Sequence, residues 1–218
     1  MRRSPALLLF GFVTAILTTD PARADDAERF HRLLDSEWTV RLAESPLLAT
    51  YVGVHTSDDR LGGATEEDFV RRERETRAFL EALGKIERAA LPAADQVSYD
   101  LFGTELADRL DSRRFGEEQL MLNADSGFHT ELAQLPDQVP LATVRDYENY
   151  LARLRQFPRV FDESIALLRR GLARGMTPPR VAIAGVDATA AAHAVATAAE
   201  SVLFKPFSDF PATFPTDE

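Results

Sequence analysis

The sequence contains no cysteine in 218 residues. This absence excludes disulfides, thiolate zinc sites, iron–sulfur clusters and cysteine nucleophiles. Positive charge is also scarce: 25 lysines and arginines stand against 35 aspartates and glutamates, which gives a net charge of −10. A surface that follows nucleic-acid phosphates requires clustered lysine and arginine. We therefore expect no nucleic-acid partner.

Common catalytic and cofactor motifs are missing as well. The sequence has no P-loop, no dinucleotide-binding glycine turn, no nucleophile elbow and no H-E-x-x-H pair. No two histidines lie within one helical turn of each other, so no helix offers a two-histidine metal face. The histidines are His31, His55, His129 and His193. We expect no catalytic, cofactor-binding or metal-binding residue and no cofactor in this chain.

Three weaker patterns have structural explanations beside the functional ones. His31 and Asp35 are spaced to share a metal on one helix face, but two ligands do not make a site, and a surface hydrogen bond or ion pair is favoured. The fragment His129–Glu131 resembles part of the zinc deaminase motif, whose cysteine partners this sequence lacks. Residues 123–127 resemble a calcium loop without its remaining ligands and fit an Asx-rich turn better.

The N-terminus has the pattern of a secretory signal peptide. Two arginines precede an apolar run at 6–17, and Ala22-Arg23-Ala24 supplies the small-x-small cleavage pattern. The alternative is a retained membrane anchor, but the run has roughly 12 residues where a span needs about 20. We expect cleavage after Ala24, a mature chain of residues 25–218 without a membrane anchor, and a periplasmic or secreted location.

Apolar residues recur at helical spacing along most of the mature chain, which predicts an all-α fold of about six helices. The first helix should span about 26–43, stop at the Ser45-Pro46 step, and bury one stripe. That stripe is Phe30, Leu34, Trp38 and Leu42. Residues 47–63 are predicted to form a loop or a short extended stretch.

Two threonines mark later helix starts. Thr65 is a good N-cap because acidic residues follow it, and Thr143 with Asp146 has capping-box spacing. Between these starts, a helix over about 95–113 should turn a set of apolar residues inward. That set is Val97, Leu101, Phe102, Leu106 and Leu110. In the helix after Thr143, Tyr147 and Tyr150 could line a sugar or peptide cleft, but their spacing is more typical of the core.

The remaining segments are predicted from composition. Residues 115–142 lose the helical period and predict a long irregular connection, which often lines a functional cleft. Pro158 predicts a break between two helices, and the alanine-rich run 188–199 predicts another helix. The tail from Lys205 to Glu218 is rich in proline and phenylalanine and should be extended. Its phenylalanines have no later element to cover them, which suggests a missing partner.

Short segments in a fixed order resemble the bacterial family called domain of unknown function 885 (DUF885). They are Glu37-Trp38, Ser45 to Gly53, Asp59-Arg60-Leu61, Leu135-Pro136, Asp146 to Leu154, Pro158, Gly171 to Gly175, Pro178-Pro179-Arg180 and Lys205 to Pro211. The resemblance covers nearly the whole mature chain. It implies a helical protein similar to zinc metallopeptidases of the carboxypeptidase Taq type, whose H-E-x-x-x-G-H-like motif lies far downstream. Zinc is thus implied for full-length relatives alone.

Two hypotheses follow. In the first, residues 25–218 are the N-terminal helical portion of a larger metallopeptidase-like domain, truncated or split, inactive alone, and partnered by a missing C-terminal half. In the second, the chain is a stand-alone exported helical module that binds a peptide or partner without chemistry. The phenylalanine-rich tail favours the first hypothesis.

Overall fold

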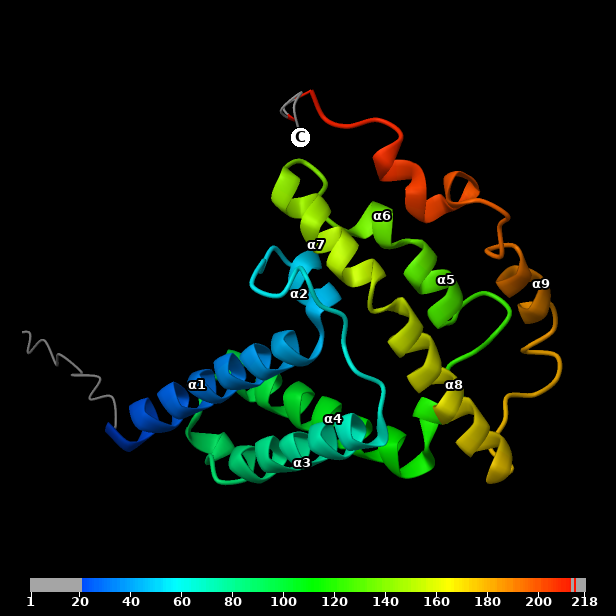
Figure 1. Cartoon of the computed structure of the whole chain (residues 1–218). Coiled ribbons are helices and arrows are strands. Elements are labelled where there is room, and N and C mark those ends of the chain that lie inside the picture. The colour runs from blue at the N-terminus through cyan, green and yellow to red at the C-terminus, as the bar shows by residue number, and fades with distance from the viewer. Residues whose placement is uncertain (1–20, 213, 215–218) are drawn as a thin grey trace, which may run out of the picture.

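The computed structural model describes residues 21–212 and 214 (Figure 1). Every regular element in this part is helical, so the all-α expectation is confirmed. The longer helices are α1 (Pro21–Glu44), α3 (Glu66–Leu83), α4 (Ala93–Phe115), α7 (Val144–Leu154) and α8 (Phe157–Ala173). The short ones are α2 (Pro46–Tyr51), α5 (Phe128–Ala133), α6 (Leu135–Gln138) and α9 (Val186–Ala191), with 3-10 turns η1 (Arg88–Ala90), η2 (Glu117–Gln119), η3 (Ala198–Glu200) and η4 (Val202–Phe207).

The helices form two groups that α2 joins. Helices α1, α3 and α4 pack together, with α3 and α4 as an antiparallel hairpin, and α5 to α8 lie on the other side (Figure 1). Most of the predicted signal peptide falls on residues 1–20, outside the described residues. No helix of the described part is both long enough and apolar enough to span a membrane.

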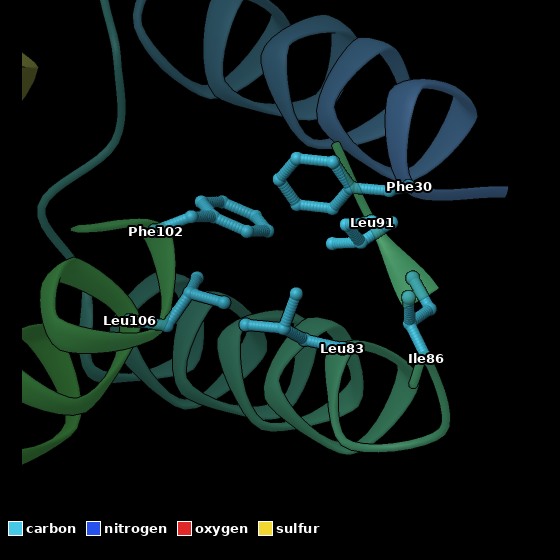
Figure 2. Close-up of a cluster of buried hydrophobic side chains, with 6 residues drawn as sticks. All are labelled: Phe30, Leu83, Ile86, Leu91, Phe102 and Leu106. Atoms are coloured by element: carbon cyan, nitrogen blue, oxygen red, sulfur yellow. The ribbon is translucent and has the colours of Figure 1, made fainter. Parts of the chain in front are cut away.

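The main core lies inside the first group (Figure 2). Phe30 of α1 meets Leu83 of α3 and Phe102 and Leu106 of α4, and two residues of the α3–α4 connection close the cluster. These two residues are Ile86 and Leu91. Burying one such side chain contributes about 1.5–3 kcal/mol, so this cluster fixes the α3–α4 hairpin against α1.

Both predicted helix starts are confirmed as capping boxes. The Thr65 hydroxyl accepts a hydrogen bond from the Asp68 backbone N–H, and the Asp68 carboxylate accepts one from the Thr65 backbone N–H at 3.1 Å. Thr143 and Asp146 repeat the arrangement at α7. Each box satisfies backbone donors that a helix start otherwise leaves without partners.

The predicted buried stripes are partly wrong. Trp38 is 41% exposed, and the buried residue beside it is Glu37, which accepts from Arg41 and from Arg109. On α4, Phe102 and Leu106 are buried, whereas Val97 and Leu101 are exposed. Each step along a helix turns the side chain by about 100°, so Leu101 cannot share the inward direction of Phe102.

Several predicted loops contain short helices, which explains why the structure has more helical segments than the six expected. The segment predicted as a loop at 47–63 begins with α2, whose first residue is proline, a favoured residue at a helix start. The connection at 115–142 contains η2, α5 and α6. The predicted break at Pro158 is confirmed, since α7 ends at Leu154 and α8 begins at Phe157.

The alanine-rich helix predicted at 188–199 is wrong beyond Ala191. Helix α9 ends there, and residues 191–200 are exposed. An isolated helix of that length is marginal in water, and this segment has no packed face to support it. The tail also differs from the expected extended chain, because its first part forms η4 and folds back onto α7.

Candidate functional site

A buried arginine joins α7 to the loop that follows α2. Arg153 lies near the C-terminal end of α7 and is 1% exposed. Its guanidinium donates to the carbonyls of Arg60, Ser57 and Pro46, at 2.9, 3.2 and 3.3 Å, and to the Thr50 hydroxyl at 2.6 Å. Arg153 therefore holds several points of a loop that has little regular structure of its own, together with Gln156, whose side chain binds the Leu61 N–H and the Asp59 carbonyl.

Asp58 balances the charge of this arginine and orients a histidine. One carboxylate oxygen accepts from the Thr50 hydroxyl at 2.5 Å and lies 3.8 Å from the Arg153 guanidinium. The other lies 2.8 Å from Nδ1 of His55, which is half-exposed. Burial lowers the pKa of Arg153, and the negative charge of Asp58 opposes that shift. When Nδ1–H of a histidine is donated to a carboxylate, Nε2 is left to accept a proton or a ligand.

An open cavity of about 370 Å³ borders this pair. His55, Asp58 and Asp59 line it from the loop, and Asp146 and Asn149 line it from α7. Its size falls within the range of small-molecule pockets, about 300–1,000 Å³, but its lining is polar where such pockets are mostly apolar. The cavity can offer hydrogen bonds and negative charge to a small polar group.

Asp146 is already engaged in the cap of α7. Burial opposes ionisation of this carboxyl, but hydrogen bonds from the backbone N–H groups of Ala142 and Thr143 hold its pKa below the ordinary value. The Asp146 carboxylate thus stays charged at the edge of the cavity. Its hydrogen bonds are those of the α7 cap.

The structure separates the candidates that the sequence suggested. His31 contacts Asp95 on α4, with 3.1 Å between Nε2 and Oδ2, so a surface polar contact is confirmed but its partner is not Asp35. His129 is buried and its Nε2 lies 3.0 Å from the Thr189 hydroxyl, which ties α5 to α9. The turn at 123–127 is the expected Asx turn: the Asn123 side-chain oxygen accepts from two backbone N–H groups.

These residues do not fit the zinc that the family resemblance implies. Within residues 21–212 and 214, no group of three or more histidines and acids gathers as a metal site. His55 with Asp58, and His31 with Asp95, offer two ligands each. Catalytic zinc is held by three protein ligands. No step through a metal can therefore be assigned to the residues that the structure describes.

A second feature of α7 is an aromatic face that holds the C-terminal segment. We call Tyr147 and Tyr150 the tail-binding face, and residues 201–210 the tail segment. The Tyr147 hydroxyl donates to the Pro206 carbonyl at 3.0 Å, and the Tyr150 hydroxyl donates to the Leu203 carbonyl at 2.8 Å. Burial raises the pKa of both tyrosines, which keeps their hydroxyls protonated and able to donate.

Aromatic rings complete this contact. The Phe207 ring lies 5.6 Å from the Tyr147 ring and 5.8 Å from the Tyr150 ring, between centroids, and Phe214 lies 4.9 Å from Tyr147. The tail phenylalanines were expected to lack a later element to cover them, and the structure shows that the earlier helix α7 contacts Phe207, while Phe210 stays half-exposed. Tyr147 and Tyr150 are buried, as their helical spacing indicated.

The comparisons with known proteins identify a family and nothing finer. The family model described as "Bacterial protein of unknown function (DUF885)" matches residues 46–218. Because the match covers well over half of the sequence, the protein belongs to this family. No curated protein and no solved structure matches the chain.

Proposed function

We propose that this chain is a helical, non-catalytic portion of a metallopeptidase-like DUF885 protein. Membership of the family supports the assignment to a DUF885 protein. The observation that supports a non-catalytic role is the His55–Asp58 pair, which has two metal ligands where a peptidase zinc needs three. Zinc chemistry would then depend on residues other than the described ones.

The purified protein tests this proposal directly. We expect less than a stoichiometric amount of zinc after equilibration with the metal and dialysis, measured by inductively coupled plasma mass spectrometry, and no cleavage of a mixed peptide library. One tightly bound zinc per chain, or zinc-dependent cleavage, would contradict the proposal. The His55→Gln variant is the matched control, because its zinc content would be lower if the unmodified protein held zinc at the His55–Asp58 pair.

The nucleotide sequence after the Glu218 codon gives a second test. An in-frame or one-base-shifted segment encoding an H-E-x-x-x-G-H-like motif is expected for the front portion of a metallopeptidase-like protein. Unrelated sequence at that place would argue against this proposal.

We further propose export through a signal peptide cleaved after Ala24. The arginines, the apolar run and the Ala22-Arg23-Ala24 pattern support it. N-terminal sequencing of the protein from a periplasmic fraction should begin at Asp25. The Ala24→Asp variant should remain uncleaved, whereas Ala27→Asp, beyond the cleavage pattern, should be processed normally. Processing at another residue, or none, would contradict the assignment.

A second candidate function is a peptide-binding module, and the tail-binding face favours it. Two tyrosine hydroxyls there bind main-chain carbonyls, which every peptide carries. The double variant Phe204→Ala, Phe207→Ala weakens the internal occupant, so it should bind phenylalanine-rich peptides more tightly than the unmodified protein does. Calorimetry that shows no such gain would remove this candidate.

A further inference from the structure

The tail segment reaches α7 through a stretch that contacts little of the molecule. Residues 191–200 are exposed without interruption. The hydrogen bonds given for their backbone run to positions no more than four residues away. The last firm attachment before them is Thr189, bonded to His129. In Figure 1 this connector follows the outside of the molecule from α9 to the tail.

The contacts at the other end of the connector are self-contained. They include the Leu203 and Pro206 carbonyls, which accept from the tail-binding face, and the Phe207 ring against both tyrosines. The Phe210 and Phe214 rings add contacts with Tyr147, and η4 also packs on α6. The two carbonyls and the Phe207 ring lie within η4, and every tail group that contacts Tyr147 or Tyr150 belongs to residues 203–214. Nothing in their geometry requires that the tail and the face belong to the same chain.

We propose that two copies of this chain exchange their tail segments, so that the tail of each copy binds the tail-binding face of the other. The exchange preserves every hydrogen bond and ring contact of the closed form, so forming the dimer costs little free energy. The connector at 191–200 acts as the hinge, since its opening breaks hydrogen bonds that are all local. A second copy is the partner that already carries the matching segment.

A complementation experiment tests the exchange. One full-length variant, Tyr147→Ala with Tyr150→Ala, keeps an intact tail and loses the face. The other, Phe204→Ala with Phe207→Ala, keeps an intact face and weakens the tail. Each variant alone should be monomeric in light scattering coupled to size-exclusion chromatography. Their mixture should form a one-to-one complex with twice the mass, held by the one intact tail–face pair.

The connector length gives an independent readout. Deleting residues 193–196 shortens the reach of the tail to its own α7, so the dimer fraction of the otherwise unmodified protein should rise by about tenfold at fixed concentration. Inserting four glycine or serine residues after Ala194 should change the dimer fraction little, because the entropic cost of closing a loop grows only slowly with its length. The same insertion after Gly53, in a loop remote from the connector, is the matched control and should leave the fraction unchanged.

Three outcomes would overturn the proposal. The first is a mixture of the two variants that stays monomeric while circular dichroism shows both folded. The second is a mixed complex that survives when the tail of the first variant is also mutated at Phe204 and Phe207. The third is a dimer fraction that does not change when residues 193–196 of the connector are deleted.

Discussion

The Arg153 guanidinium donates to the Thr50 hydroxyl at 2.6 Å, although 103 residues separate the two in sequence. The same hydroxyl donates onward to Asp58, which in turn holds His55. One buried side chain of α7 thereby helps to set the shape of the loop after α2 and the position of the His55–Asp58 pair.

Replacing Arg153 with methionine should strongly destabilise the protein. The substitution removes the donor for three backbone carbonyls and leaves Asp58 without its balancing charge. Removing one partner of a buried ion pair costs about 3–5 kcal/mol. Urea unfolding monitored by circular dichroism measures the loss. Arg155→Met is the matched control: Arg155 is exposed at the end of the same helix, and a change within about 0.5 kcal/mol is expected.

Two leucines of α4 should respond to truncation with losses of very different size. Leu106 is fully buried in the core, and Leu106→Ala should lower the free energy of unfolding by about 2–5 kcal/mol. Leu101 is 66% exposed on the same helix, so Leu101→Ala should cost less than about 0.5 kcal/mol. Equal losses in thermal or urea unfolding would contradict the assigned orientation of α4.

The cap of α3 predicts a pH dependence. The Thr65 hydroxyl donates to the Asp68 carboxylate at 2.7 Å, and Arg71 adds a second hydrogen bond, so the pKa of Asp68 falls to about 2 from its ordinary 3.8. A carboxyl whose pKa is lowered by folding stabilises the protein above its unfolded pKa and loses that contribution as the pH falls through its folded pKa. The stabilisation should therefore be complete above pH 4 and disappear towards pH 2.

The Asp68→Asn variant checks this dependence. At pH 7 it should be less stable than the unmodified protein by about 1 kcal/mol, the usual cost of a lost cap. Between pH 4 and pH 2 the difference should shrink towards zero, as followed by urea unfolding at several pH values. Glu67→Gln, an exposed change in the same first turn, should show neither effect. A difference that does not depend on pH would show that the carboxylate charge is not responsible.

The tail-binding face should depend on its two hydroxyl groups. Tyr150→Phe keeps the ring but removes the hydrogen bond to the Leu203 carbonyl, at a cost of about 1 kcal/mol. Hydrogen exchange of residues 201–210 should speed up, with little change in α3 and α4. Tyr51→Phe is the control, because Tyr51 is 81% exposed, and it should leave the exchange of the tail unaltered. Faster exchange throughout the molecule would point instead to general destabilisation.

The features predictable from the sequence are those that neighbouring residues decide. The Thr65 N-cap, the Thr143 capping box and the break before Pro158 depend on residues a few positions apart, and all three are confirmed. The short α2 and the early end of α9 depend on whether other elements cover them, which local spacing does not encode.

The candidate site was missed for the same reason. Arginine is usually exposed to solvent. Arg153 is buried because its guanidinium donates to carbonyls about a hundred residues earlier in the chain. One signal was present: Arg153 lies three residues after Tyr150, and hence on the face of α7 that was predicted to be buried. A charged residue on such a face indicates a buried partner elsewhere in the chain.

The long reach of Arg153 also sets an order of events during synthesis. Helices α1, α3 and α4 follow one another closely in the chain, and their contacts can form as soon as they leave the ribosome. The Arg60 carbonyl must wait for a partner 93 residues later. At about 5–20 residues per second, that is a delay of about 5–20 seconds. Until then, water alone can satisfy the loop carbonyls that Arg153 binds in the folded protein.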